Sequence, residues 1–267
     1  MSVTVGIFDS GVGGLTVARA VLRKLPGASI LYYADNAYVP YGGRPLSEIC
    51  TFATEIVRFL ASHGAQIIAV GCNMSSIAIE DMGAAASCPV PKVTTLGPGA
   101  RRAAALTKNG VVGVIATLGT VRSRAFTRRL LAQEGVRRVL EVPCPAFVPL
   151  TERGELDSPD AFRLARRYLE PLRRAGVDTV IYGCTHYPLL ERPIRAALGD
   201  DIALVDPAEA MAEEVARLAD GRAAQRSQTG HHFFASGTPN SLRALAPRWL
   251  GAEVNGVAIV DVHRRPP

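Results

Sequence analysis

Hydrophobic and polar positions follow a pattern of strands that alternate with helices. Short apolar runs that end in a small or polar residue are typical of buried strands, and the chain holds them at residues 5–8, 67–70, 112–115 and 179–182. Apolar residues three or four positions apart predict amphipathic helices, as at Leu46, Ile49, Phe52, Ile56 and Phe59 and at Phe162, Ala165, Leu169 and Leu172. This alternation predicts an α/β fold with parallel sheets.

The second half of the chain repeats the first. Residues 5–10 (VGIFDS) resemble 112–117 (VGVIAT), 38–42 (YVPYG) resemble 147–151 (FVPLT), and 64–73 (GAQIIAVGCN) resemble 176–185 (GVDTVIYGCT). We expect the middle pair to be loops, and the helix after each loop to stop at a glycine. A repeated order of elements builds similar units. We therefore predict two pseudo-symmetric α/β lobes, the first from 1–96 plus 208–267 and the second from 97–207.

Polar residues and thiols stand where the predicted strands end. These residues are Asp9, Ser10, Cys72, Asn73, Thr117, Cys184 and Thr185. Ligands of parallel sheets bind outside the carboxyl ends of the strands. We expect the lobes to face each other across one active-site cleft with a thiol on either wall. The alternative is that the two Gly-Cys turns are only tight corners with small, buried residues.

Each thiol also precedes a predicted helix, and a helix start favours the thiolate. Pro188 suits the first turn of the helix after Cys184, and Asn73 or a following serine is available to cap the helix after Cys72. Two acid–base groups on opposite sides of one molecule suit a racemase or epimerase, since a proton leaves one face of a carbon and arrives on the other. A Cys-His-Asn hydrolase remains an alternative, as does a metal site made of Cys72, Cys184, His186 and Asp9.

Composition limits the other classes of function. The 267 residues are 48% hydrophobic and 20% charged, and they contain no apolar run long enough for a membrane span, so we expect no membrane partner. The first residues do not resemble an export signal, and we expect a cytoplasmic protein. The net charge of +6 comes from scattered arginine pairs without a nucleic-acid-binding motif, so we do not expect nucleic acid as a partner.

No cofactor or metal ion is expected. The glycine-rich segment 11–14 resembles a dinucleotide-binding loop, but Thr16 stands where the last glycine of that motif belongs. The sequence contexts of Lys24, Lys92 and Lys108 do not suggest a Schiff-base lysine. The five cysteines are an odd number without a CxxC pair and do not look like a disulfide framework. We interpret those other than Cys72 and Cys184 as packing residues: Cys50, Cys88 and Cys144.

Four motifs resemble a known family: residues 6–15 (GIFDSGVGGL), 38–42 (YVPYG), 72–73 (CN) and 183–189 (GCTHYPL). Together they closely resemble glutamate racemase, within the cofactor-independent aspartate/glutamate racemase group. The resemblance extends to about Ala210. It implies a pyridoxal-independent interconversion of L- and D-glutamate that supplies peptidoglycan synthesis. It also implies a homodimer and a C-terminal segment that returns to complete the first lobe.

The resemblance further implies the roles of individual residues. Cys72 and Cys184 are the expected acid–base pair, and Asp9, Glu152 and His186 are expected to support thiol ionisation and proton transfer. The expected substrate contacts are Asp9, Ser10, Tyr41, Gly42, Asn73, Met74, Thr185 and His186.

Two positions depart from the family pattern. Met74 stands where the family usually has a threonine that contacts the substrate, and Gly97 stands where glutamate is often found. Both cysteines are retained, so the departures bear on substrate identity more than on the class of reaction. The alternatives are a racemase of another amino acid, such as aspartate, and a non-catalytic homologue with a different role.

Overall fold

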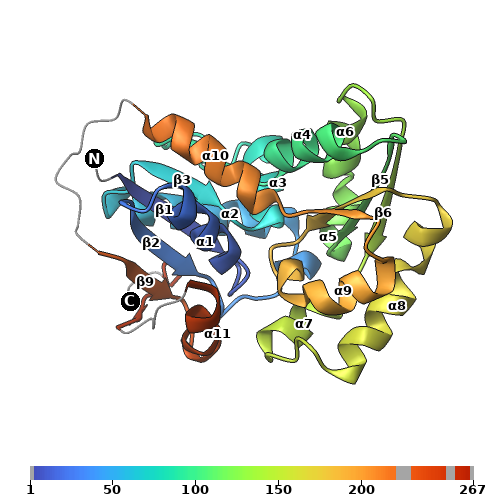
Figure 1. The fold of residues 1–267 in the computed structure, drawn as a ribbon. Helices are drawn as coiled ribbons and strands as arrows, with labels where there is room; N and C mark the ends of the chain where they lie inside the picture. Colours follow the sequence, from blue (N-terminus) through green and yellow to red (C-terminus); the bar gives the residue numbers. More distant parts are fainter. Residues whose placement is uncertain (1–2, 221–229, 251–255, 265–267) are drawn as a thin grey trace.

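The computed structural model describes residues 3–220, 230–250 and 256–264, and within them it contains two parallel sheets (Figure 1). The first sheet has the order β10-β9-β2-β1-β3-β4 and the second β6-β5-β7-β8. The strands of the first sheet are β1 (Thr4–Asp9), β2 (Ser29–Ala34), β3 (Ile67–Val70), β4 (Lys92–Val93), β9 (His232–Ala235) and β10 (Ala258–Ile259). Those of the second are β5 (Val111–Ala116), β6 (Arg138–Pro143), β7 (Thr179–Gly183) and β8 (Ala203–Val205).

The two sheets share one internal arrangement. The order β2-β1-β3-β4 in the first corresponds to β6-β5-β7-β8 in the second, and all these neighbours are parallel. Phe8 of β1 pairs with Val70 of β3, and Ala116 of β5 pairs with Gly183 of β7. The predicted fold class is therefore confirmed: two similar α/β lobes with parallel sheets.

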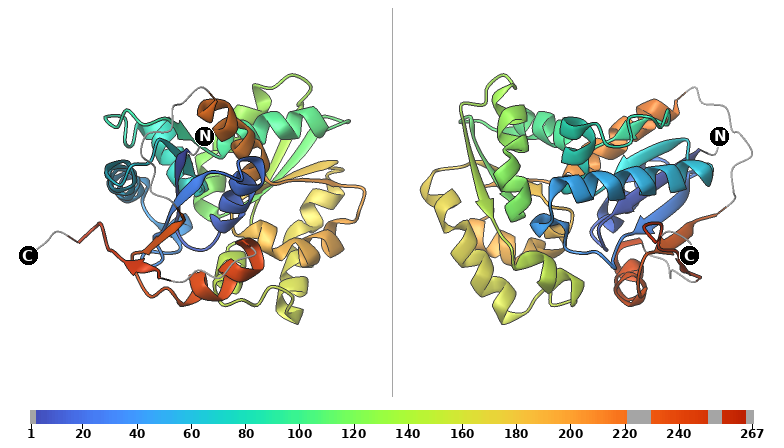
Figure 2. Two further views of the ribbon diagram at one scale, coloured as in Figure 1. Left: turned by 60° about the vertical axis from the view of Figure 1, so that its left-hand side comes forward. Right: turned by 180° about the vertical axis from the view of Figure 1, so that it is seen from behind.

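Helices cover both faces of each sheet (Figure 2). In the first lobe, α1 (Leu15–Lys24) packs with α10 (Pro207–Ala219) and α11 (Asn240–Leu250) on one face, and α2 (Leu46–Ser62) packs with α3 (Asn73–Met82) on the other. In the second, α8 (Pro159–Arg174) and α9 (Glu191–Leu198) cover one face, while α4 (Leu96–Leu106) and α6 (Ala125–Leu131) cover the other. The remaining helices are short: α5 (Leu118–Ser123), α7 (Phe147–Glu152), η1 (Tyr41–Gly43) and η2 (Tyr187–Leu190).

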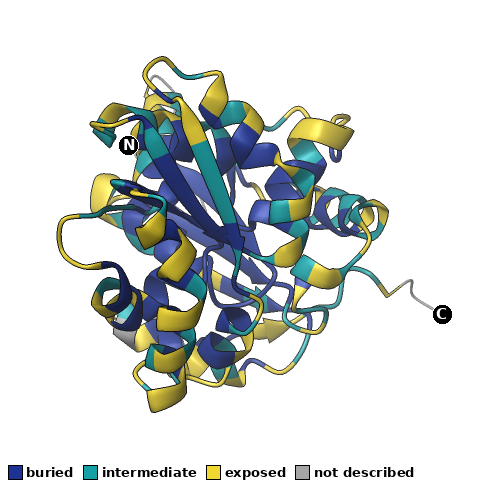
Figure 3. Cartoon of the chain, turned by 90° about the vertical axis from the view of Figure 1, so that its right-hand side faces the viewer, coloured by how far each residue is buried: buried dark blue, intermediate teal, exposed yellow. Residues whose placement is uncertain are grey.

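The strands are continuous apolar runs because helices cover both faces of each sheet. Ile7 belongs to the cluster under α1 and its neighbour Phe8 to the cluster under α2, because successive side chains of a strand point to opposite faces. Every residue of β1 and β7 is buried, whereas the helices are exposed on their outer sides (Figure 3). The expected helix ends are also found. Gly64 and Gly176 follow α2 and α8 with φ of 91° and 68°, values that glycine adopts without steric cost.

Of the two predicted loops, residues 38–42 enter the short 3₁₀ helix η1 at Tyr41, and residues 147–151 are wholly helical. Residues 147–151 were expected to be a loop, but α7 includes all of them and ends at Glu152. Phe147, Val148 and Leu150 are buried on this helix, so tertiary packing favours it. Pro149 is tolerated because it lies in the first turn, where backbone N–H groups have no partner within the helix.

The C-terminal part of the chain returns to the first lobe. Helix α10 packs on α1, and β9 and β10 extend the first sheet beyond β2. We propose that the lobes divide at 96/97 and 207/208, close to the ends of β4 and β8. Residues 221–229, 251–255 and 265–267 of the expected first lobe lie outside the described residues. Among the described residues, no helix combines the length and apolar character needed to cross a bilayer.

Candidate active site

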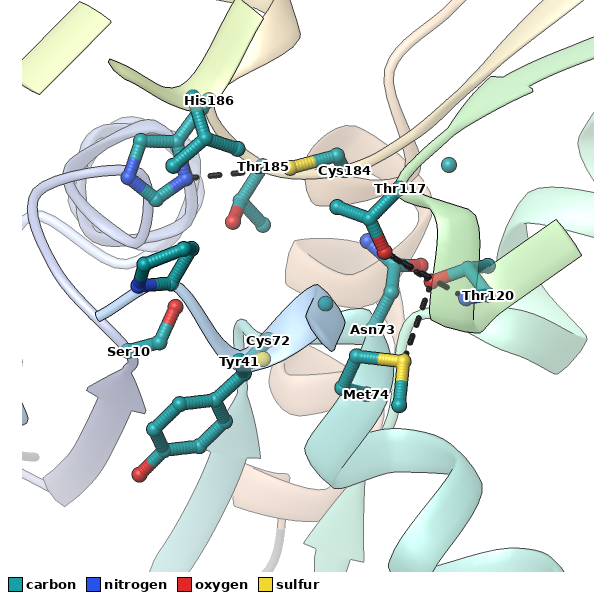
Figure 4. A pocket seen from close by; sticks show the side chains of 14 residues that line it. Ser10, Tyr41, Cys72, Asn73, Met74, Thr117, Thr120, Cys184, Thr185 and His186 are labelled. Atoms are coloured by element: carbon teal, nitrogen blue, oxygen red, sulfur yellow. Dashed lines mark hydrogen bonds between the residues drawn. The ribbon is translucent and has the colours of Figure 1, made fainter. Parts of the chain in front are cut away.

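The carboxyl ends of the strands from both lobes enclose a single pocket (Figure 4). Cys72 follows β3 of the first lobe, and Cys184 follows the corresponding strand β7 of the second. The pocket is lined by Ser10, Pro40, Tyr41, Gly42, Cys72, Asn73, Met74, Thr117, Thr120, Val148, Gly183, Cys184, Thr185 and His186. The two thiols predicted to share one cleft are thus brought together.

This pocket is narrow. Its volume of about 20 Å³ leaves room for roughly one water molecule, which is far less than an amino acid occupies. We therefore expect the surrounding walls to move apart when an amino acid binds.

The Cys72 thiol is buried at the N-terminal end of α3. Burial and the nearby charge of Asp9 raise its pKa to about 12. The expectation that the helix start favours a Cys72 thiolate is therefore wrong in this structure, since loss of hydration outweighs the effect of the helix start. Asn73 does not cap α3 either. Its Oδ1 accepts a hydrogen bond from the Thr95 hydroxyl at 2.7 Å.

The Cys184 thiol faces a buried histidine. Its Sγ lies 3.8 Å from Nδ1 of His186, and Nε2 of the same ring lies 2.6 Å from Oε1 of Glu152. Burial alone lowers the pKa of His186, but hydrogen bonds with Cys184 and Glu152 outweigh it and raise the pKa well above the usual value. The segment after Cys184 begins as the 3₁₀ helix η2, and α9 starts only at Glu191.

The carboxylate of Glu152 completes this arrangement. Burial raises its pKa, but hydrogen bonds from His186 and from the backbone N–H of Val12 have the larger combined effect and lower it. An imidazolium–carboxylate pair is therefore favoured near neutral pH. Glu152 does not line the pocket and instead contacts His186 on the side away from Cys184.

Asp9 lies beneath the pocket and links the two lobes. Its Oδ1 accepts the backbone N–H of Gly11 at 2.9 Å, and its Oδ2 accepts the Thr185 hydroxyl at 2.8 Å. The carboxylate is fully buried and is not among the residues that line the pocket. Asp9 is thus placed to hold Thr185 and to influence Cys72, and it does not reach the pocket itself.

The other predicted contact residues line the pocket, with two unexpected details. The Tyr41 hydroxyl donates to Asp35 and points away from the pocket (Figure 4), so Tyr41 presents its ring and backbone. The Met74 sulfur accepts a hydrogen bond from the Thr120 hydroxyl at 3.5 Å. Gly97 lies in α4 and does not line the pocket.

Sequence reasoning assigned no role to several lining residues: Pro40, Thr117, Thr120, Val148 and Gly183. Thr117 stands at a predicted strand end, which was a usable signal, and Thr120 follows one helical turn later. Within the described residues, no three His, Cys, Asp or Glu side chains are arranged to hold a metal ion, so the four ligands of the alternative metal site do not converge. The cysteines interpreted as packing residues are free thiols; Cys88 and Cys144 are buried, and Cys50 is partly exposed.

Comparison with known proteins gives a consistent result. Residues 15–215 match the Asp/Glu/Hydantoin racemase family. The chain is 42% identical over 262 residues to a glutamate racemase of Geobacter metallireducens, covering 97% of this chain and 96% of the relative.

Solved structures agree with this match. A glutamate racemase from Bacillus anthracis shares 35% identity over 97% of both chains with a TM-score of 0.88. A glutamate racemase from Francisella tularensis in complex with D-glutamate shares 27% identity over 98% of both chains with a TM-score of 0.86. The chain therefore belongs to the Asp/Glu/hydantoin racemase family and resembles its glutamate racemases along nearly its whole length.

Proposed function

We propose that this protein interconverts L- and D-glutamate by a two-base mechanism without a cofactor. The observation that carries the proposal is the position of Cys72 and Cys184, which follow corresponding strands of opposite lobes and line one pocket. A carbon bound between them has one thiol on each of its faces, which is the geometry that inversion needs. The Francisella relative is described in complex with D-glutamate, and this supports glutamate as the substrate.

In the proposed reaction, one cysteine acts as thiolate and the other as thiol. The thiolate removes the α-proton from one face of the amino acid, and its electron pair stays on the substrate as a carbanion. The opposite thiol then donates its proton to the other face, which yields the other enantiomer and leaves the second sulfur as thiolate. Exchange of one proton with solvent restores the starting state. The two sulfurs exchange roles for the reverse direction.

His186 and Glu152 are proposed to support Cys184 in this cycle. The imidazole faces the Cys184 sulfur, and the Glu152 carboxylate stabilises its protonated form. Asp9 was expected to support thiol ionisation, but burial and the charge of Asp9 both disfavour the Cys72 thiolate. The raised pKa of Cys72 favours its thiol form, which is the form that donates a proton.

The substrate carboxylates need fixed donors, because the α-proton is only weakly acidic and developing charge must be stabilised. Cys72 precedes α3, whose first backbone N–H groups are suited to an anion. The Asn73 Nδ2 is buried without a hydrogen-bond partner in the described structure, and it supplies a further donor. Ser10 and Thr185 add hydroxyls on the pocket wall.

The biological setting is proposed from the resemblance. It places the enzyme in the cytoplasm as a homodimer that supplies D-glutamate for peptidoglycan. We expect sedimentation equilibrium of the purified chain to give twice the monomer mass, and a monomer at all concentrations contradicts the dimer. Loss of the gene is expected to make growth depend on added D-glutamate.

The reaction is tested by proton NMR in D₂O with L-glutamate, D-glutamate and both enantiomers of aspartate, under reducing conditions and without pyridoxal phosphate. We expect loss of the α-proton signal from both glutamate enantiomers, and chiral chromatography of the products is expected to show that each enantiomer forms from the other. Cys184→Ser and Cys72→Ser variants are each expected to abolish racemisation. Full activity in either variant contradicts the two-base mechanism. Exchange of aspartate alone assigns a different substrate.

A further inference from the structure

A buried polar cluster lies behind the pocket wall formed by residues 40–42. The Tyr41 hydroxyl donates to Oδ2 of Asp35, which directly follows β2. Asp35 is fully buried, and its Oδ1 has no hydrogen-bond partner in the described structure. A carboxylate in this position needs a donor, because burial without compensation is costly. None of the roles proposed for the pocket residues uses this carboxylate.

His263 supplies the second contact to this carboxylate. Its Nε2 lies 3.0 Å from Oδ2 of Asp35, and its Nδ1 lies 2.6 Å from Oε2 of Glu55 on α2. Only 5% of the His263 side chain is exposed, and its ring lies 4.3 Å from the ring of Phe52 between centroids. One imidazole ring therefore joins the two carboxylates and packs on an aromatic face.

The segment that carries His263 is itself anchored to the first lobe. The backbone N–H of Val260 donates to the carbonyl of Ala235 at 2.8 Å, and the Val260 carbonyl accepts the Tyr33 hydroxyl at 2.8 Å. The Tyr38 hydroxyl donates to Asp261 at 3.1 Å. The position of the imidazole is thus fixed independently of the pocket.

We propose that His263 is a positioning residue, which fixes the pocket wall at residues 40–42 by holding the Asp35 carboxylate that anchors Tyr41. Pro40, Tyr41 and Gly42 all line the pocket, and the Tyr41 ring is buried. A segment more than 200 positions away in sequence thereby sets one wall of the site. The expected effect of His263 on substrate binding rests on the proposed function.

The expected consequence is a change in substrate binding more than in proton transfer. The wall at residues 40–42 carries neither thiol, so its loosening weakens ground state and transition state alike. Loss of an interaction that stabilises both states equally raises KM and leaves kcat nearly unchanged. Loss of His263 also leaves Asp35 with only the Tyr41 hydroxyl, since its other oxygen is already without a partner.

The test compares His263→Ala, His263→Gln and Arg264→Ala in the full chain. Arg264→Ala is the matched control, because Arg264 is the adjacent residue and its side chain is 85% exposed, so that its surface ion pair with Asp261 contributes little. We expect His263→Ala to raise KM for glutamate about tenfold with kcat within about threefold. Glutamine restores a donor to Asp35 without the imidazole, so His263→Gln is expected to recover part of the KM. The control is expected to match the wild type.

A second readout does not depend on the substrate. Cys72 lines the pocket with Tyr41, so a loosened wall exposes its thiol to alkylation by iodoacetamide. Peptide mass mapping is expected to show Cys72 modified about tenfold faster in His263→Ala than in the wild type. If the wild type does not racemise glutamate, the proposed function fails, and this readout still decides the role of His263.

The inference is overturned if a folded His263→Ala protein keeps both the wild-type KM and the wild-type Cys72 alkylation rate. It is also overturned if kcat falls as much as kcat/KM, which places His263 in the chemical step. Thermal unfolding establishes that each variant folds. If His263→Ala does not fold, Glu55→Gln replaces it, because Glu55 holds the same imidazole from a partly exposed position.

Discussion

The Thr185 hydroxyl donates a 2.8 Å hydrogen bond to Oδ2 of Asp9 and so joins the strand ends of the two lobes. Both residues are buried, and the acceptor is a carboxylate, which makes the bond stronger than one between neutral groups. Thr185 also lines the pocket directly beside Cys184. The bond therefore couples the relative position of the lobes to the geometry around one thiol.

Thr185→Val tests this coupling, because valine has a similar shape and lacks the hydroxyl. We expect the free energy of unfolding to fall by about 1–3 kcal/mol in urea titration, since a buried carboxylate oxygen loses its donor. Thr185→Ser keeps the hydroxyl and is expected to stay close to the wild type. Equal stability of all three proteins contradicts this view of the bond.

The His186–Glu152 pair predicts a pH-dependent contribution to stability. The pKa of His186 is raised, so its contribution is complete below about pH 6.5 and declines as the pH rises through the folded-state value. The pKa of Glu152 is lowered, so its contribution is complete above about pH 4.5 and declines as the pH falls through the folded-state value. The pair therefore contributes most between these limits.

Glu152→Gln removes the charge with little change in shape. We expect a loss of about 1–3 kcal/mol in the free energy of unfolding near pH 5.5 to 6, and a smaller loss in alkaline buffer. Urea titrations across this range measure the difference between wild type and variant. A loss that stays constant with pH means that the pair is not ionised as described.

Gly13→Ala is predicted to displace His186. A Cβ atom at Gly13 lies 2.6 Å from both Nδ1 of His186 and Oγ1 of Thr185, so these side chains must move. We expect racemase activity to fall by about 100-fold or more, because small displacements of positioned groups are costly to catalysis. Gly27→Ala is the control, since a Cβ there meets nothing within 4 Å. Wild-type activity in Gly13→Ala argues against a role for the His186 position.

Met74→Thr is predicted to shift selectivity toward glutamate, which is one methylene longer than aspartate. The buried methionine contacts Thr120 and takes up space in a pocket of only about 20 Å³. A shorter side chain leaves room for one further methylene, which in an apolar pocket is worth about 10-fold or more in discrimination. We expect the ratio of kcat/KM for glutamate to that for aspartate to rise accordingly. An unchanged ratio means that Met74 does not set substrate length.

The repeated strand and helix patterns predicted the fold well, because each pattern is encoded by neighbouring residues. Residues 64–73 and 176–185 resemble each other in strand pattern and in the glycine that precedes each cysteine, and they occupy matching places in the two sheets. The exception at residues 147–151 has a tertiary cause. Burial of Phe147 and Leu150 in the second lobe favours a helix in a segment that was expected to be a loop between a strand and a helix.

The sequence by itself determined the α/β class, the internal repeat, the two cysteines at strand ends and the family resemblance. These features could be predicted because neighbouring residues encode the ends of strands and the periodicity of helices. Only the tertiary structure decided how charge and burial act on the thiols. The raised pKa of Cys72 depends on burial and on Asp9, which lies 63 positions earlier. The contact between His263 and Asp35 spans 228 positions, and no local pattern encodes it. Such contacts arise from the packing of distant segments, and they set the local dielectric and hydrogen-bond partners on which the proposed chemistry depends.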